Sequence, residues 1–330
     1  MKILLVVNSK LPVLKYGGTQ RVIWYLAKEL KQLGHYVALM AYAGTHCDFV
    51  DQVLVYDHEK DIALQLQDTY DIIHFHCFPR NPQALNIPYV MTLHGNIFHK
   101  APLDRNTIFI SKKHAALYGS SNFVYNGLDF NDYGSPNLKY DNSYFHFLAK
   151  ARWSVKNLKG AIATIKKVPG GQLKVLGGNR FKSKLGLADL LSTATRFEGK
   201  VGGEYKNQLI KNSKGLLFPV IWNEPFGLAI IESLYLGTPV FGTTHGSLPE
   251  LITEEVGFLS NHLEDLVENM KAVDCFDRKR CHEYAADQFN SRRMALDYLK
   301  YYEKCIDQKT LHVQPPVLQG DNNMDLEFVF

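Results

Sequence analysis

Short apolar runs alternate with amphipathic stretches along the first part of the chain. Ile3–Val7 is an unbroken apolar run, which is typical of a strand buried on both faces. Gly17–Gly34 follows with apolar residues at helical spacing, and Gly34 is a suitable C-terminal stop. Further strands are predicted at Tyr36–Tyr42, Gln52–Tyr56, Asp71–Phe75, Pro88–Leu93, Thr107–Ile110 and Asn122–Tyr125. This alternation indicates parallel strands with crossover helices, an α/β fold.

Turn-forming residues between Asn126 and Asn137 interrupt the alternation, which then starts again. The second series is predicted as strand Tyr144–Leu148, helix Lys156–Lys167, strands Gln172–Leu176 and Arg196–Glu198, helix Gly203–Asn212, strand Gly215–Phe218, helix Pro225–Leu236 and strand Thr238–Phe241. Two or three helices are expected within residues 261–306. We therefore expect two doubly wound domains, residues 1–137 and 138–309, whose last helix packs back on the first domain. Residues 310–330 are expected to form a loose tail or an edge segment.

The composition supports a globular protein of two domains. The chain has 330 residues, of which 46% are hydrophobic and 21% charged, which excludes disordered, collagen-like and disulfide-scaffold classes. A net charge of +4 and a pI of about 8.6 are too weakly basic to predict a nucleic-acid partner. They suit an anionic small ligand or an anionic membrane surface equally well.

The cysteines and the N-terminus indicate a cytoplasmic protein. Five cysteines form no CxxC pair, which favours reduced thiols over a disulfide framework or a zinc site. No apolar stretch reaches the ~18 residues that span a bilayer. The N-terminal apolar run is too short for a signal peptide and is not followed by a cleavage site.

Ligands of doubly wound sheets bind beyond the carboxyl ends of the strands, so these loops hold the first candidate residues. Gly17 and Gly18 precede the first helix, where backbone amides and the helix N-terminus suit a phosphate. The alternative is an ordinary turn. His94 ends another predicted strand and could bind a sugar hydroxyl or only pack there. His74 and His76 project to one face, but without a third ligand no metal site is expected.

Two glutamates flank the start of the predicted helix Pro225–Leu236. Pro225 is expected in the first helical turn, where its missing amide donor costs nothing. The outward-facing amides would then be those of Phe226, Gly227 and Leu228. Glu224 and Glu232 could accept hydrogen bonds from vicinal hydroxyls of a ribose or hexose. The alternative roles are a helix cap and a solvated side chain, but two glutamates around a glycine-bearing turn favour binding.

Two cations follow the predicted strand Tyr144–Leu148. Arg152 and Lys156 could neutralise a diphosphate, with the guanidinium binding oxygens in a bidentate manner. The alternative is a solvated basic loop. A second basic cluster, near the first helix, could attract an anionic membrane or form a solvated face. It consists of Lys10, Lys15, Lys28 and Lys31.

Taken together, these segments resemble the retaining glycosyltransferases of family 4, which have the GT-B fold. The motifs, in chain order, are Gly17-Gly18, Thr92-Leu93-His94-Gly95, Tyr125-Asn126-Gly127-Leu128-Asp129, Arg152 with Lys156, Glu224-Pro225-Phe226-Gly227 with Glu232, Gly237-Thr238-Pro239-Val240 and Leu248-Pro249-Glu250. The resemblance runs from residue 1 to about residue 305, and the E-x7-E segment is its most specific motif. It implies two Rossmann-like doubly wound domains facing an interdomain cleft. The N-terminal domain would hold the acceptor and the C-terminal domain the nucleotide-sugar.

The resemblance also implies residue roles at the diphosphate. Arg152 and Lys156 match the pair that clamps the donor diphosphate. Gly17 and Gly18 would approach the same group from the other domain.

At the donor's sugar and nucleoside, Glu232 matches the glutamate that binds the ribose hydroxyls. Glu224 matches the one near the donor sugar's hydroxyls, beside the amides of Phe226, Gly227 and Leu228. His94 matches a histidine near the sugar ring, and backbone groups around Val201 would meet the base.

Three positions depart from the family pattern. Ala151 and Ser233 stand where glycine and alanine are usual, and Gly246-Ser247 replaces a glycine pair. The last change affects how closely the backbone can approach the donor. None removes a charged group that the chemistry needs.

The implied activity is transfer of a hexose or related sugar from a nucleoside-diphosphate sugar to an acceptor hydroxyl, with retention of configuration. The donor is a substrate with UDP or GDP as the expected nucleotide, and no cofactor is expected. The acceptor would be a glycan or a lipid-linked molecule in polysaccharide, lipopolysaccharide or other glycoconjugate synthesis. Because no DxD motif accompanies the two cations, the reaction is expected to be metal-independent.

Two other functions fit the same fold. They are a sugar-nucleotide epimerase and a catalytically silent nucleotide-sugar binding protein. A dinucleotide oxidoreductase is disfavoured by the missing GxGxxG motif.

Overall fold

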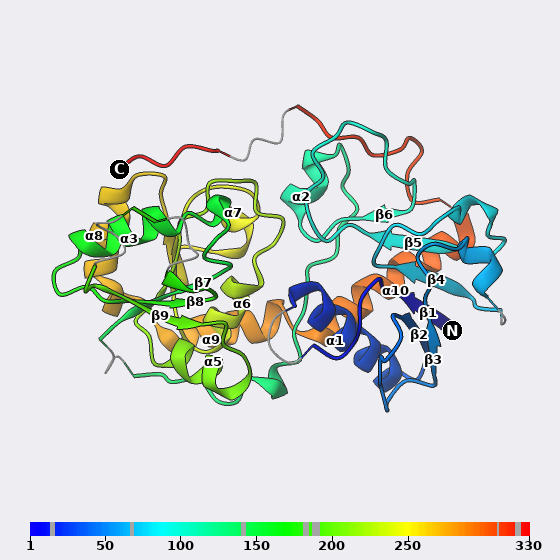
Figure 1. Cartoon of the computed structure of the whole chain (residues 1–330), viewed down its shortest axis with the longest axis horizontal. Helices are drawn as coiled ribbons and strands as arrows, with labels where there is room; N and C mark the ends of the chain where they lie inside the picture. The colour runs from blue at the N-terminus through cyan, green and yellow to red at the C-terminus, as the bar shows by residue number, and fades with distance from the viewer. Residues whose placement is uncertain are drawn as a thin grey trace. The chain divides into compact units, whose positions relative to one another are not determined.

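The structure is a computed structural model that describes residues 1–13, 17–66, 69–139, 143–180, 185–186, 192–308, 310–320 and 325–330. The chain separates into two compact units, each built on its own sheet (Figure 1). Among the described residues, unit 1 contains Met1–Val13, Gly17–Asp129 and residues 289–320. Unit 2 contains Phe130–Gln288 and residues 325–330.

Unit 1 contains a parallel sheet of six strands in the order β3-β2-β1-β4-β5-β6. The strands are β1 Lys2–Val6, β2 Tyr36–Ala41, β3 Gln52–Val55, β4 Ile72–Phe75, β5 Tyr89–Thr92 and β6 Thr107–Ile108. Residues 3–6 of β1 are fully buried, which explains the unbroken apolar run. The strand order reverses between β1 and β4, so the loops after these two strands lie at the topological switch point.

The α-helices described in unit 1 are α1 Gly18–Gln32, α2 Lys112–Leu117 and α10 Ser291–Gln308. The buried face of α1 carries the apolar residues at helical spacing, and α10 packs against α1 and β5. The Ser291 hydroxyl donates to Glu29 Oε1 at 2.8 Å, which ties the start of α10 to α1.

The chain leaves unit 1 after Asp129 and returns to it at Phe289, and the two crossing segments are hydrogen-bonded to each other. The Leu128 amide donates to the Phe289 carbonyl at 3.0 Å, and the Ser291 amide donates to the Leu128 carbonyl at 2.9 Å. A Cβ on Gly127 would lie 2.3 Å from the Asn290 carbonyl oxygen. The Asn-Gly-Leu-Asp motif therefore contributes a close contact between backbones.

Unit 2 repeats the arrangement with the strand order β12-β11-β10-β7-β8-β9, all parallel. The strands are β7 Phe145–Leu148, β8 Leu173–Leu176, β9 Thr195–Gly199, β10 Leu216–Phe218, β11 Val240–Gly242 and β12 Gly257–Leu259. The described helices are α3 Leu158–Lys167, α5 Gly203–Lys211, α6 Leu228–Tyr235, α7 Leu248–Leu251, α8 Leu263–Lys271 and α9 Arg278–Gln288. The switch point of this sheet lies between β7 and β10.

One strand prediction was wrong, and one strand was missed. The predicted strand Asn122–Tyr125 contributes only a single bridge, between Phe109 and Phe123. The Phe109 amide donates to the Asn122 carbonyl at 3.0 Å and the Val124 amide donates to the Phe109 carbonyl at 2.8 Å, but the pairing ends there. Strand β12 was missed because its three residues carry too little apolar pattern to stand out.

Residues beyond 310 are attached to both units by backbone hydrogen bonds. In unit 1, the Leu103 amide donates to the Pro316 carbonyl at 2.8 Å, and the Val317 amide donates to the Tyr118 carbonyl at 3.1 Å. In unit 2, the Leu326 amide donates to the Ile221 carbonyl at 2.8 Å. Each described part of the tail is therefore hydrogen-bonded to the unit in which it lies. Across the described parts of the chain, no helix has the length and apolar character needed to cross a membrane.

Candidate active site

The loops after β7 and β10 meet at the switch point of unit 2, because these strands are neighbours in the sheet. The Ile221 amide donates to the Val155 carbonyl at 2.9 Å. Asn157 adopts the left-handed conformation, caps α3 by accepting from the Gly160 amide, and donates through Nδ2 to the Pro219 carbonyl at 2.9 Å. Backbone and side-chain bonds therefore join the two loops.

Lys156 and Glu224, one from each loop, form a buried ion pair between Nζ and Oε2. The indole nitrogen of Trp222 donates to the same oxygen at 2.6 Å. Lys156 Nζ also lies 4.8 Å from the centre of the Trp222 ring and 5.3 Å from that of Phe218. The centre of a third ring, that of Trp153, lies 5.9 Å away, so the ammonium is held by one carboxylate and three aromatic rings.

Arg152 lies in the same loop as Lys156, but its side chain is exposed. Within the described residues, its guanidinium has no ion pair. The neighbouring loop after β8 fits closely against this segment, since a Cβ on Gly178 would lie 2.4 Å from the methyl carbon of Ala151. The alanine that replaces the family's usual glycine is therefore accommodated by a glycine of the next loop.

The turn after β11 fixes the backbone around Glu224. Gly246 has a φ of +60°, and a Cβ there would lie 2.1 Å from the Glu224 nitrogen. The Ser247 amide donates to the Glu224 carbonyl at 2.9 Å, and its hydroxyl donates to the Phe226 carbonyl at 2.8 Å. The serine that departs from the usual glycine pair adds a hydrogen bond to the candidate site.

Helix α6 begins at Leu228, so the prediction that Pro225 occupies its first turn was wrong. Gly227 is the N-cap residue with a φ of +91°, which interrupts the helical path. Phe226 and Gly227 therefore precede the helix, and of the three predicted amides only that of Leu228 belongs to its first turn. Glu224 lies in the preceding loop rather than on the same element as Glu232.

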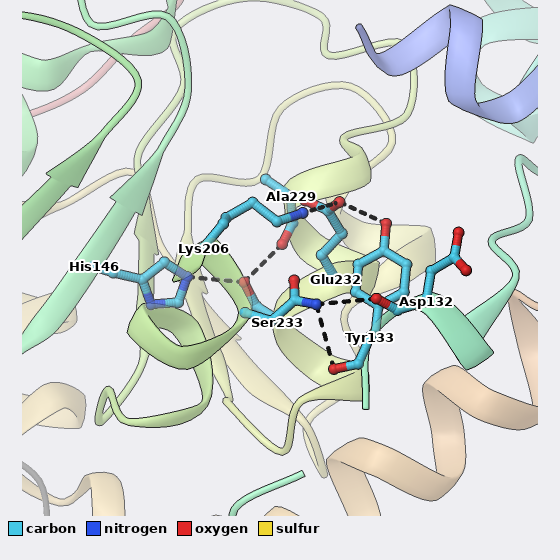
Figure 2. Close-up of polar contacts among 8 residues, drawn as sticks. Asp132, Tyr133, His146, Lys206, Ala229, Glu232 and Ser233 are labelled. Carbon is cyan, nitrogen blue, oxygen red and sulfur yellow. Dashed lines mark hydrogen bonds and ion pairs between the residues drawn. The ribbon is translucent and has the colours of Figure 1, made fainter. Parts of the chain in front are cut away.

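Glu232 lies within α6, is only 2% exposed, and accepts two hydrogen bonds at one oxygen (Figure 2). The Tyr133 hydroxyl donates to Oε1 at 2.7 Å, and Lys206 Nζ pairs with the same atom at 2.7 Å. Sequence reasoning missed both partners. A signal for Lys206 existed, because it shares the buried face of α5 with Asn207, Leu209 and Ile210.

Ser233, the second departure, pairs with a buried histidine of β7. His146 Nε2 lies 2.9 Å from the Ser233 hydroxyl, which donates to the Ala229 carbonyl at 2.7 Å (Figure 2). Burial lowers the pKa of His146 to about 3, so the ring is neutral at neutral pH. The serine therefore supplies a hydrogen-bond partner that an alanine would not.

In unit 1, His76 and His94 follow the neighbouring strands β4 and β5. His76 Nδ1 and His94 Nε2 lie 2.9 Å apart, within hydrogen-bond distance. His74 and His76 project to one side, as predicted, with ring centres 3.9 Å apart. The nitrogens of His74 contact the hydroxyls of Tyr302 and Thr92, each at 2.7 Å. Burial lowers the pKa of His94 to about 4, which makes it a neutral hydrogen-bonding group.

The other residues predicted to bind the donor are Gly17, Gly18 and Val201, which belong to neither the Lys156–Glu224 pair nor the Glu232 cluster. Gly17 and Gly18 stand at the start of α1, whose first turn has neither an acidic residue nor a side-chain cap. Val201 is buried after β9. A hollow of about 590 Å³ lies between the loop after β8 and the full length of β9. Its lining residues are Gly178, Asn179, Arg180, Thr195, Arg196, Phe197, Glu198 and Gly199.

The basic cluster near the first helix is partly neutralised. Lys28 pairs with Asp129, and Lys31 Nζ lies 2.7 Å from Asp51 Oδ2. Lys15 lies outside the described residues. The positive charge expected to attract an anionic membrane is therefore reduced at two of its four positions.

Comparison with known proteins extends these observations. Residues 134–285 match the family model of glycosyl transferases group 1. D-inositol 3-phosphate glycosyltransferase of Streptomyces avermitilis is 34% identical over 90 residues, which are 27% of this chain and 18% of that protein. An uncharacterized 41.2 kDa protein in the cps region of Klebsiella pneumoniae is 28% identical over 95 residues, 27% of this chain and 26% of that protein. The matched segments are thus about a quarter or less of these relatives.

Solved structures match over nearly the whole chain at low identity. AviGT4, a glycosyltransferase involved in avilamycin A biosynthesis, has a TM-score of 0.74 at 19% identity, covering 93% of this chain and 98% of that chain. Sucrose-phosphate synthase (tll1590) from Thermosynechococcus elongatus has a TM-score of 0.75 at 18% identity, covering 93% and 99%. Anabaena Alr3699/HepE, in complex with UDP and glucose, has a TM-score of 0.68 at 18% identity, covering 92% and 100%.

Two parallel six-stranded sheets with these neighbours define the GT-B fold of glycosyltransferases, which confirms the predicted fold class. The segment 134–285, which lies in unit 2, therefore carries the sequence pattern of the glycosyl transferases group 1 family. The family resemblance predicted from the motifs is confirmed.

Proposed function

We propose that the protein transfers a hexose or related sugar from a nucleoside-diphosphate sugar to an acceptor hydroxyl, with retention of configuration. The observation that carries this proposal is the buried Lys156–Glu224 pair at the switch point of unit 2, with Arg152 exposed on the same loop. Ligands of doubly wound folds bind at this edge of the sheet, and cations there suit a diphosphate. The family match over residues 134–285 supports the same activity.

In this proposal, Arg152 and Lys156 stabilise the charge that accumulates on the diphosphate as the glycosidic bond breaks. The Leu228 amide at the start of α6 adds a further donor. The acceptor hydroxyl attacks the face from which the diphosphate departs, and a diphosphate oxygen takes its proton. No protein base is then required, and the two positive side chains take the role that a metal ion would otherwise have.

The other predicted residues would bind the rest of the donor. Glu224 would accept hydrogen bonds from the sugar's hydroxyls, and Glu232 from those of the ribose. His94 of unit 1 would hydrogen-bond the sugar as a neutral imidazole. The base would bind beside Val201, towards the hollow between β9 and the loop after β8.

We propose a uridine nucleotide as donor, since HepE structures of the same fold contain UDP and UDP-glucose. For the acceptor we propose a glycan or lipid-linked hydroxyl in glycoconjugate synthesis. Exposed Phe78 and Phe98, on the loops after β4 and β5, offer aromatic faces on which a sugar ring could stack. Gly17 and Gly18 at the start of α1 stay a prediction as diphosphate ligands.

The test compares wild type with the Arg152→Ala, Lys156→Ala double variant in transfer from UDP-glucose and other donors at saturating concentration. We expect turnover to fall by at least about 100-fold, because the fixed positive groups at the leaving diphosphate are lost. Lys159→Ala, which removes an exposed lysine of α3, is the matched control. Unchanged turnover in the double variant would refute the clamp.

The same assay separates the other functions of this fold. An epimerase would isomerise the donor sugar without an acceptor, and a silent binding protein would be stabilised by the nucleotide without consuming the donor. A chelator added to the wild type tests the proposed metal independence. A thermal-shift screen with UDP, GDP, ADP, CMP and TDP identifies the base, since a ligand at 100 times its Kd stabilises by about 2.7 kcal/mol.

A further inference from the structure

Lys206 and Tyr133 form a buried polar cluster with Glu232 that the motifs of the chain did not predict (Figure 2). Lys206 is 7% exposed, Tyr133 2% and Glu232 2%. A carboxylate with so little contact with water needs a compensating positive charge and hydrogen-bond donors. The ammonium and the phenol supply both at a single oxygen, each at 2.7 Å.

The three side chains come from three separate segments, so the cluster is not a local feature of one helix. Lys206 lies on α5, Glu232 on α6, and Tyr133 follows the short turn Phe130–Asp132. The Asn207 amide nitrogen donates to the Asp132 and Tyr133 carbonyls at 3.2 and 3.3 Å. Two adjacent residues of α5 therefore have separate roles. Lys206 binds the Glu232 carboxylate, and Asn207 binds the backbone of Tyr133, whose hydroxyl is the second donor to Glu232.

The aromatic ring of Tyr133 adds a further restraint. Lys206 Nζ lies 5.0 Å from its centre, in the range of a cation–π contact. The ring also packs edge-on against Tyr235, near the end of α6, with centres 6.1 Å apart. The hydroxyl and the ammonium thus approach Glu232 from fixed positions, which restricts the rotamers of the carboxylate.

We infer that Lys206 and Tyr133 are positioning residues that hold the Glu232 carboxylate in the orientation in which it recognises the vicinal hydroxyls of the donor's ribose. This inference rests on the proposed function, and it adds which residues make the site specific for the ribose of the nucleoside. Hydroxyls are recognised strongly only by acceptors fixed in place, because a mobile carboxylate loses conformational freedom on binding. The cluster selects ribonucleotides over deoxyribonucleotides.

The experiment measures the Kd of UDP, GDP and ADP and of their 2′-deoxy counterparts by calorimetry, and continues with the base that binds most tightly. Wild type is expected to bind the ribonucleotide about tenfold or more tightly, as for a hydrogen bond to a charged group. Lys206→Met and Glu232→Gln are expected to bring this ratio close to one, and Tyr133→Phe to lower it severalfold. Lys206→Arg, which keeps the charge, should recover part of the preference.

The matched control is Lys211→Met on the same helix, whose ammonium lies 3.9 Å from Glu204 at the surface. It should leave the ratio unchanged. A role in folding alone would weaken ribonucleotide and deoxyribonucleotide equally, so an unchanged ratio in both Lys206→Met and Tyr133→Phe overturns the inference. Equal binding of both nucleotides by wild type overturns it too. Tyr133→Phe removes only one oxygen atom. If the lysine variant does not fold, the ratio of the two Kd values can still be measured in this variant.

Failure of the inference and failure of the proposed function give different results. Sugar transfer by wild type with a ribose preference that does not depend on Lys206 would leave the function standing and remove the positioning role. A ribose preference that depends on Lys206, without any sugar transfer, would leave the positioning role and remove the transferase.

Discussion

At the scale of single residues, unit 2 carries two buried lysine–glutamate pairs, Lys156–Glu224 and Lys206–Glu232. A buried ion pair is weak evidence of net stabilisation, but removing one partner leaves an uncompensated charge out of water. The pairs are therefore sensitive to single substitutions in a way that surface pairs are not. Burying these charges costs desolvation free energy. Such a cost is expected at a site whose charged side chains must bind a charged ligand.

Lys156→Met is expected to lower the free energy of unfolding by about 3–5 kcal/mol, because the Glu224 carboxylate stays buried without its cation. Adding Glu224→Gln should recover part of this loss, since the amide carries no charge. Urea denaturation of the single and double variants measures both effects. Lys167→Met is the control, because its pair with Glu264 is about half exposed and should contribute nothing measurable. Equal losses in the two lysine variants would contradict the burial argument.

A second prediction at the residue scale concerns how stability depends on pH. Burial lowers the pKa of His94 to about 4. An exposed histidine titrates near pH ~6.5, so between these values the unfolded chain binds a proton that the folded chain does not. The stability contribution is complete above about pH 6.5 and is lost as the pH falls towards 4. His94→Gln should make the decline of Tm between pH 7 and pH 4 shallower, as measured by thermal unfolding.

Other buried histidines contribute to the same decline of Tm with falling pH. The test is therefore the difference between the slopes of the variant and the wild type. Burial also lowers the pKa values of His114 and His146 to about 3. His99 is exposed, and His99→Gln should reproduce the wild-type slope. A His94 variant with the same slope as wild type would show that this ring is not held neutral by the fold.

At the scale of elements, the paired crossing segments depend on a glycine. A Cβ on Gly127 would lie 2.3 Å from the Asn290 carbonyl oxygen and 2.7 Å from its carbon, so the backbones would have to separate. We expect Gly127→Ala to lower the free energy of unfolding by about 1–3 kcal/mol, as for an overpacked site. Chemical denaturation measures it. Gly186→Ala, where a Cβ meets nothing within 4 Å, is the control and should be near neutral.

Most strands could be predicted because a buried parallel strand needs an apolar run, and such runs are visible in the sequence. The start of α6 could not, because Pro225 and the following residues are compatible with a helix until Gly227 adopts a φ of +91°. The Phe226 carbonyl beside this glycine accepts a hydrogen bond from Ser247, a residue of a turn 21 positions further along the chain. Local sequence carries no record of such contacts.

The residues of the candidate site also fall into those that the sequence could predict and those that it could not. Lys156 and Glu224 could be found because they follow predicted strands, and Glu232 because it completes the E-x7-E motif on a predicted helix. Lys206 and Tyr133 could not, since they reach Glu232 from 26 and 99 residues away. Periodicity shows that Lys206 shares a buried helix face, but not which carboxylate it meets there.

At the scale of the whole molecule, residues 325–330 run across three successive loops at the carboxyl edge of the second sheet. The Leu326 amide donates to the Ile221 carbonyl after β10, and His245 Nε2, after β11, lies 2.7 Å from the Glu327 carbonyl oxygen. The Val329 amide donates to the Asn261 carbonyl after β12 at 2.8 Å. The first of these loops continues through Trp222 to Glu224, so a segment distant in sequence restrains the candidate site.

Deleting residues 325–330 is therefore expected to weaken binding of UDP by about tenfold in calorimetry, while unit 2 stays folded by circular dichroism. The reason is that Ile221 loses a backbone hydrogen bond and the loop carrying Glu224 gains freedom that the ligand must remove. A synthetic peptide with the sequence of residues 325–330 should restore part of the affinity in trans, and a scrambled peptide should not. Phe330→Ala, which removes an exposed ring but keeps the backbone bonds, should bind like wild type. A truncated chain with wild-type affinity would mean that the loops after β7, β10 and β11 hold the carboxylate without help from this segment.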